Sequence, residues 1–436
     1  MQIGFLQSWH LVFLTAAFLY SAQAKMVENF EQPGKLGDRW TASSGMRLER
    51  VDVPVEVRHE GVERRMLQVV ARAGGSFASQ PNFPRCRFHA ATMVKFRAQA
   101  PDASAAAPLV FEFQVYSTER KAWRWSKVTL DAPDWRTVEL PTKYFRHSPA
   151  AYLPFEETRR FAFRFLSAGR FNLDTIELVD AGFGTRPAEL SLEEIAELAF
   201  GSEATIHRGK SFAVITDEPR LKPTETMAAL DKMLSMILTD FPELKAPKQL
   251  SPLLVFSDEA RYRAFWAQLA EKFNSEGPTP ESDGYSMLGI AGSFYDHRLG
   301  SVRPVYLHEA CHAVMARLFG ISSEGDWLHE GLANYYQLRW TNQDLGSIAK
   351  TLVANRRLIS LQGLLNGRTI AMEHYAQAAL FIEWIMVNST RKARLLPAIR
   401  FMAKEGSTTF EPAARSQFGA SVQRIESSWI RWIQSR

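Results

Sequence analysis

The sequence VYLHEACHAVMARLFGISSEGDWLHEGLANYY occupies residues 305–336 of the chain. Its first half predicts a helix. Pro304 suits a first helical position, Gly320 suits the residue just past the end, and nothing between them breaks a helix. A second helix is expected to begin at Trp327, because Asp326 is a good N-cap residue. This stretch therefore predicts two consecutive helices joined by a short loop.

Two histidines and a glutamate on these helices have the spacing of a metal centre. Side chains four positions apart share one helix face, so His308 and His312 can offer two imidazole nitrogens to one metal ion. A catalytic zinc normally has three protein ligands and a water, and Glu330, in the first turn of the second helix, is the candidate third ligand. The alternative is a pair of histidines with structural hydrogen bonds in a buried helix. The glutamate at short range favours the metal centre over that alternative.

Neighbouring residues have predicted supporting roles. Asn334 lies one turn after Glu330 and could hydrogen-bond the outer nitrogen of a ligating histidine, which would fix its tautomer. Gly331 and Ala333 would let the second helix pack closely against the first, whereas His329 is expected to be a bystander.

The segments HEACH and WLHEGLANYY resemble the gluzincin metallopeptidases, and within them the families with a WLxEGxAxY-type second motif. The resemblance covers residues 305–336. It implies a Zn²⁺ cofactor held by His308, His312 and Glu330, with Glu309 as the general base that activates a zinc-bound water. In these families the fold is a mixed α and β peptidase domain with a helical C-terminal part.

A further resemblance concerns the segment HYAQ at residues 374–377, which is similar to the YxKG and YxQ segments of gluzincins. It implies that Tyr375 donates a hydrogen bond to the oxyanion, a role suited to a phenol beside a polarised carbonyl. The residues alone leave open a core tyrosine with a satisfied hydroxyl.

The stretch 285–294 is expected to be one strand directly upstream of the first helix. In gluzincins an edge strand there holds the substrate backbone by ladder hydrogen bonds, which implies substrate binding by Gly289, Ile290, Ala291 and Gly292. In the aminopeptidases the strand carries a GxMEN motif whose glutamate grips the free amine. Here these residues include no acid, and the seventeen residues between the second histidine and Glu330 are one fewer than usual. The sequence therefore favours an endopeptidase over an aminopeptidase.

The N-terminal half has a different pattern. Polar and apolar residues alternate along several short segments bounded by Gly, Pro, Asp and Ser, which predicts an antiparallel β-sandwich over residues 25–180. The opening and closing strands resemble jelly-roll modules of the galactose-binding type, which implies a structural Ca²⁺ near Glu31 and Asp174. Trp123 and Trp125 could stack on sugar rings of a glycan or cell-wall ligand, or they could be core residues.

The remaining segments complete the domain organisation. Residues 1–24 are predicted to be a signal peptide for export to the periplasm or medium, with an apolar core at 11–20 and small residues at Ala22 and Ala24. An uncleaved anchor is the alternative, although the apolar run is short for a membrane span. Residues 181–190 are expected to be a linker and 191–436 the α+β zinc domain with a helical C-terminal part.

Composition excludes some function classes. The net charge of +5 comes from 52 basic and 47 acidic residues without a basic run, so nucleic-acid binding is not expected. The two cysteines, Cys86 and Cys311, are expected to be buried free thiols. The sequence as a whole predicts an exported zinc metallopeptidase acting on a peptide or protein. A glycan- or wall-binding protein with a non-catalytic zinc domain, or a zinc enzyme acting on a non-peptide amide or ester, stays open.

Overall fold

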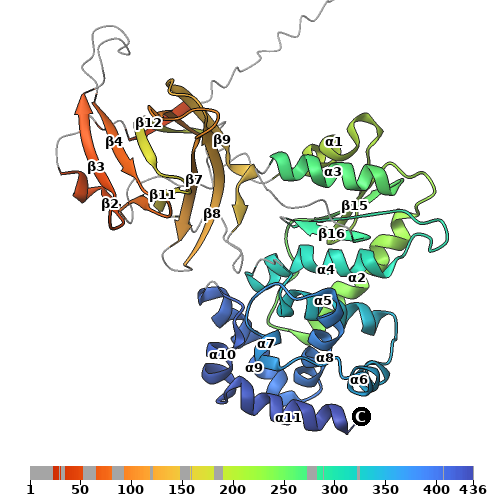
Figure 1. Cartoon of the computed structure of the whole chain (residues 1–436). Coiled ribbons are helices and arrows are strands. Elements are labelled where there is room, and N and C mark those ends of the chain that lie inside the picture. Colours follow the sequence, from red (N-terminus) through yellow and green to blue (C-terminus); the bar gives the residue numbers. More distant parts are fainter. Residues whose placement is uncertain are drawn as a thin grey trace, which may run out of the picture.

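The computed structural model places most of the chain in two regions of different architecture (Figure 1). It describes residues 23–28, 30, 35–52, 65–80, 93–117, 121–147, 158, 160–180, 190–272, 282–287, 289–321, 325–405 and 407–435. Among these residues there is no helix with the length and apolar character needed to cross a membrane. Most of the predicted signal and linker, together with Glu31 and Cys86, lies outside the described residues.

The N-terminal region forms two antiparallel sheets, as predicted. The described strands of the first sheet are β3 (Arg47–Asp52), β4 (Arg65–Ala71), β12 (Gly169–Asp180), β6 (Met93–Gln99) and β9 (Arg136–Pro141), with β1 (Gln23–Glu28) paired to β12. Those of the second are β10 (Arg146–His147), β8 (Ala122–Leu130), β7 (Leu109–Ser117), β11 (Arg160–Phe165), β5 (Ser76–Ser79) and β2 (Trp40–Ala42).

Phenylalanine rings join the two sheets into one core. Phe96 of β6 packs against Phe113 of β7 with ring centroids 5.8 Å apart, and Phe163 of β11 meets Phe96 edge to face at 5.5 Å. Buried and partly exposed residues alternate strictly along β6 and β7, and Phe96 and Phe113 occupy buried positions of these two strands. The period-two pattern of the sequence thus corresponds to a true sandwich.

The C-terminal region begins with a mixed sheet covered on both faces. Its order is β13 (Thr205–Arg208), β14 (Phe212–Thr216), β15 (Ser251–Phe256), β17 (Ile290–Phe294) and β16 (Gly284–Met287). Helices α1 (Leu192–Phe200) and α3 (Glu259–Lys272) pack on one face, and α2 (Pro223–Asp240) and α4 (Pro304–Phe319) pack on the other. A capping box opens α1, in which the Ser191 side chain accepts from Glu194 N and the Glu194 side chain accepts from Ser191 N.

The prediction of a single strand over residues 285–294 is wrong. The chain forms a hairpin there, in which β16 pairs antiparallel with β17. Gly289 between the two strands has a φ of 76°, a left-handed conformation that glycine adopts without steric cost. The glycine therefore turns the chain, and β16 becomes the edge strand of the sheet.

Helices fill the rest of the described C-terminal region, as predicted (Figure 1, teal to blue). They are α5 (Trp327–Trp340), α6 (Leu345–Ala354), α7 (Leu361–Leu364), α8 (Tyr375–Met386), α9 (Ser389–Glu405), α10 (Phe410–Ala413) and α11 (Val422–Gln434). Short helical turns occur at Leu36–Asp38, Thr142–Tyr144, Gly201–Glu203, Met372–His374 and Ala414–Phe418.

The two helices of the 305–336 stretch form with the predicted boundaries. Helix α4 runs from Pro304 to Phe319, and the Asp326 side chain caps α5 by accepting hydrogen bonds from Leu328 N and His329 N. The prediction that Gly331 packs against the first helix is wrong. A Cβ added at Gly331 would lie 3.1 Å from backbone atoms of Ala378 in α8. Gly331 thus allows close approach of α5 to α8 rather than to α4.

Candidate metal centre

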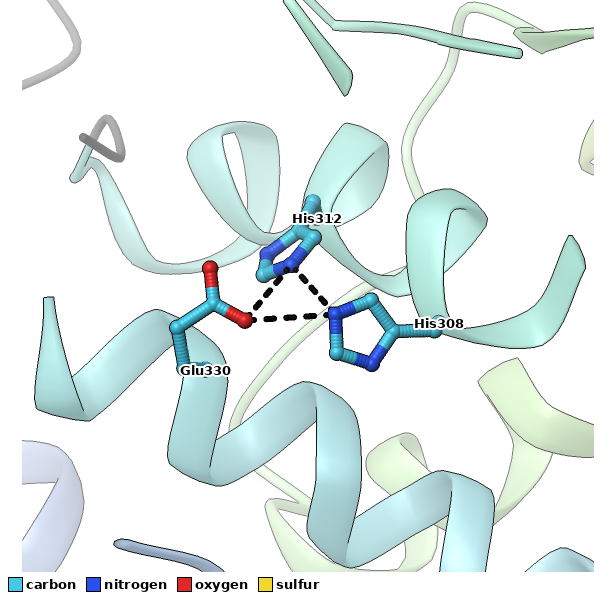
Figure 2. Close-up of side chains that lie close together, drawn as sticks. All are labelled: His308, His312 and Glu330. Atoms are coloured by element: carbon cyan, nitrogen blue, oxygen red, sulfur yellow. Dashed lines mark hydrogen bonds and ion pairs between the residues drawn. The ribbon is translucent and has the colours of Figure 1, made fainter. Parts of the chain in front are cut away.

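Helices α4 and α5 bring the three predicted ligands together (Figure 2). His308 and His312 point from successive turns of α4 toward Glu330 on α5, with their Nε2 atoms 3.0 Å apart. Glu330 Oε2 lies 3.2 Å from His308 Nε2 and 3.6 Å from His312 Nε2. Each side chain is about nine-tenths buried, so little water competes for these atoms.

The geometry of this triad fits a tetrahedral zinc ion. Zinc–ligand bonds of about 2.0–2.1 Å at tetrahedral angles place ligand atoms about 3.3–3.4 Å from one another. The three observed separations, 3.0, 3.2 and 3.6 Å, lie around that value. Two imidazole nitrogens and a carboxylate are also the donor set of catalytic zinc sites. Among the described residues, His308, His312 and Glu330 thus form a triad that could hold a metal ion.

The triad carries the negative charge that a cation needs. In the metal-free site burial opposes ionisation of Glu330, but electrostatic attraction and hydrogen bonding by His312 and His308 outweigh burial and hold its pKa well below the usual range. The carboxylate therefore stays ionised at every physiological pH.

The outer nitrogens of the two histidines have different surroundings. Gln337 Oε1 lies 3.1 Å from His308 Nδ1, whereas His312 Nδ1 is buried without a hydrogen-bond partner among the described residues. Asn334 does not take the role predicted for it, because its amide donates to the carbonyl of Glu330 at 3.0 Å. Gln337 lies two turns after Glu330 on α5, and no motif in the sequence indicates its contact with His308.

Glu309 lies beside the triad in an apolar setting. Its side chain is buried, and burial raises the pKa of the carboxyl to about 7, with the Glu330 charge adding to the shift and His308 opposing it. Strand β16 passes directly against it, since a Cβ on Gly284 would come within 2.8 Å of Glu309 Oε1. A group with this pKa can both accept and return a proton near neutral pH.

Tyr375 completes the site from the first turn of α8. Its ring stacks parallel to that of His308 with centroids 6.3 Å apart. Burial and the nearby charges of Glu330 and Glu309 raise the pKa of the phenol above its usual value. The hydroxyl is therefore a permanent hydrogen-bond donor, and Tyr375 is not a remote core tyrosine.

His329 is buried but is not one of the converging ligands. Its Nδ1 lies 3.2 Å from Asp326 Oδ2, and its Nε2 has no partner among the described residues. The buried thiol of Cys311 is free, as predicted, and burial raises its pKa strongly.

The stretch predicted to bind substrate is not at the sheet edge. Ile290, Ala291 and Gly292 belong to β17, which pairs with β15 on one side and β16 on the other. Their backbone is thus occupied within the sheet, and the free edge belongs to β16, from Gly284 to Met287. The glycine that turns the hairpin was the sequence signal for this arrangement.

The predicted ligands of the sandwich are only partly described. Asp174 is buried and pairs with Arg97 at 3.4 Å, and calcium binding there stays a prediction. Trp123 and Trp125 are half-buried on the face of β8 opposite the sandwich core, with ring centroids 6.3 Å apart. Arg146 of β10 covers the ring of Trp125 at 5.2 Å.

Among known proteins, the chain is similar to several solved structures. No family model matches the chain, and no curated protein matches it. A family 11 carbohydrate-binding module from Clostridium thermocellum is 18% identical, covers 37% of this chain and 97% of its own, and has a TM-score of 0.28. A xylan-binding domain of family 22 is 16% identical, covers 35% of this chain and 93% of its own, and has a TM-score of 0.25. A mutant family 29 module, CBM29-2, is 11% identical, covers 36% of this chain and 85% of its own, and has a TM-score of 0.24. At these TM-scores the similarity carries no argument about what this chain binds.

Proposed function

We propose that this protein is a zinc-dependent hydrolase that cleaves peptide bonds. The observation that carries the proposal is the convergence of His308 Nε2, His312 Nε2 and Glu330 Oε2 at separations that fit one zinc ion. Glu309 and Tyr375 lie beside these three ligands. The resemblance of the two helical motifs to gluzincins supports a peptide as the substrate.

Each group in the site has a chemical task. A bound zinc ion would polarise the scissile carbonyl and make the attacking water more acidic. Glu309, which lies directly after the ligand His308 on α4, is placed to take a proton from the attacking water and to pass it to the leaving amine. Tyr375 donates a hydrogen bond to the developing oxyanion, because its hydroxyl stays protonated.

The free edge of β16 is the proposed backbone-binding element. An extended peptide can add to an exposed sheet edge through main-chain hydrogen bonds. Because Gly284 has no side chain, the backbone of β16 lies against Glu309, which would bring a bound peptide close to the base. The strand sequence GYSM offers no acid for a free α-amino group, so we propose an endopeptidase. Failure of N-terminal blocking to reduce cleavage of a given peptide would support this preference, and strict dependence on a free amine would overturn it.

The decisive experiment for the reaction class is a cleavage assay on a broad peptide library, with matched ester and non-peptide amide substrates. The wild-type protein is compared with E309Q and with wild type treated with a zinc chelator. We expect peptide cleavage that zinc restores after chelation and that E309Q lacks. Cleavage of esters or non-peptide amides alone would assign a different substrate class to the same groups.

A second candidate function is glycan binding by the sandwich region. The specific observation is the pair of half-buried rings, Trp123 and Trp125, on the outer face of β8. Aromatic rings on a sheet face can stack on sugar rings. Affinity electrophoresis in gels containing β-glucan or xylan tests this function. Retardation of wild type that is lost in W123A/W125A would support glycan binding, and equal migration in every gel would oppose it.

Export is part of the same proposal. It rests on the apolar segment at residues 11–20 and the small residues Ala22 and Ala24. Mature protein that begins at Lys25, found by N-terminal sequencing of protein from the periplasm or medium, is the expected result.

A further inference from the structure

We propose that Gln337 is a positioning residue of the metal centre, which holds His308 in the tautomer and orientation needed for metal binding. The inference rests on the proposed zinc site and adds a residue to it that the motifs do not contain. The Oε1 atom of Gln337 lies 3.1 Å from His308 Nδ1, the imidazole nitrogen that faces away from the triad.

The direction of this hydrogen bond follows from the triad. His308 Nε2 is the atom that approaches His312 Nε2 and Glu330 Oε2, so it must offer its lone pair to a metal ion. A neutral imidazole then carries its hydrogen on Nδ1. Gln337 Oε1 accepts that hydrogen, which prevents the ring from turning about its χ2 angle.

Helix α5 supplies both a ligand and the partner of another ligand. Gln337 follows Glu330 by seven residues, which is about two helical turns, so the two side chains lie on the same face of α5. The backbone of Gln337 is fixed within the helix end, because its carbonyl accepts hydrogen bonds from Thr341 N and Thr341 Oγ1 at 3.0 Å. The helix therefore fixes the backbone from which the Gln337 side chain extends toward His308.

His312 has no comparable partner. Its Nδ1 is buried without a hydrogen bond among the described residues, and the Asn334 amide is engaged by the carbonyl of Glu330. Gln337 is thus the described side chain that orients a ligating imidazole. Its amide is neutral, whereas a carboxylate in the same place would make the imidazole a stronger donor to the metal.

The test is zinc affinity, measured by competition with a chromophoric chelator, for wild type, Q337L and Q337E. Loss of such an outer partner typically weakens metal affinity by about 10- to 100-fold, and we expect this loss in Q337L. Q337E keeps an acceptor and adds negative charge, so it should bind zinc more tightly than wild type. Q343L makes the same substitution at an exposed position beyond the helix end and should bind zinc like wild type.

A second readout separates positioning from general stability. The visible spectrum of the Co²⁺-loaded protein reports ligand geometry, and it should change in Q337L but return toward wild type in Q337E. Wild-type zinc affinity in Q337L would overturn the proposal for Gln337 while leaving the zinc site intact. If Q337L does not fold, Q337E decides, because affinity equal to or below that of wild type contradicts the proposal. A wild-type protein that binds no zinc would instead contradict the proposed function.

Discussion

Gly284 and Glu309 lie in direct contact across the junction of strand β16 and helix α4. A Cβ on Gly284 would come within 2.6 Å of Glu309 Cγ and 2.8 Å of Glu309 Oε1, distances at which something must move. It would also come within 2.4 Å of Val305, so neither side of the contact offers room. The edge of the sheet therefore meets the zinc helix at the residue proposed to act as the base.

The first prediction tests this contact. G284A should displace the Glu309 carboxylate and reduce kcat by about tenfold or more, because small misplacements of a base are costly. Zinc content should not change, since the nearest atoms that the added Cβ would meet belong to Val305 and Glu309 and to none of the three ligands. G37A is the matched control, because a Cβ at Gly37 meets nothing within 4 Å. Full activity in G284A would mean that Glu309 does not need its present position.

The second prediction concerns Tyr375. Y375F keeps the ring that stacks on His308 but removes the hydroxyl. We expect kcat to fall by about 10²- to 10³-fold, as for loss of other oxyanion donors, with KM and zinc content little changed. Steady-state kinetics on one library-selected peptide would measure this effect. A rise in KM with unchanged kcat would indicate that Tyr375 binds substrate instead.

The third prediction concerns the pH dependence of stability in the metal-free protein. Burial raises the pKa of Glu309 to about 7, above its ordinary value of 4.5. Below pH 4.5 the carboxyl is protonated in both the folded and unfolded states. As the pH rises toward 7 only the unfolded state ionises, so the free energy of unfolding should fall by about 3 kcal/mol. E309Q should lack this loss.

Urea denaturation in the presence of a chelator measures this difference. The stability of E309Q relative to wild type should grow as the pH rises from about 4.5 to 7 and then stay constant. E243Q, at an exposed glutamate, should follow the wild-type curve. Parallel curves for wild type and E309Q would show that the Glu309 carboxyl is not buried as described.

The local features of the site could be predicted from sequence because their causes are local. Pro304 and Asp326 set the starts of α4 and α5, and the four-residue spacing of His308 and His312 fixes their common face. Glu330 was predictable because it falls in the first turn of a capped helix close in sequence. The alternation in the N-terminal half similarly predicted a sandwich.

The features that sequence reasoning missed depend on tertiary arrangement. Which residue of α5 reaches His308 depends on how α4 and α5 cross, and the structure selects Gln337 over Asn334. Gly331 faces α8, a helix that is distant in sequence. Gly289 could be a site of close approach or a turn, and only the pairing of β16 with β17 distinguishes these roles.

The most direct test of the central claim is the zinc content of purified wild type and E330A, measured by elemental analysis after zinc loading and extensive dialysis. The account predicts about one zinc ion per chain in wild type and loss of most of it in E330A, because the third ligand is removed. Wild-type protein that retains no zinc, or E330A that retains as much as wild type, would contradict it.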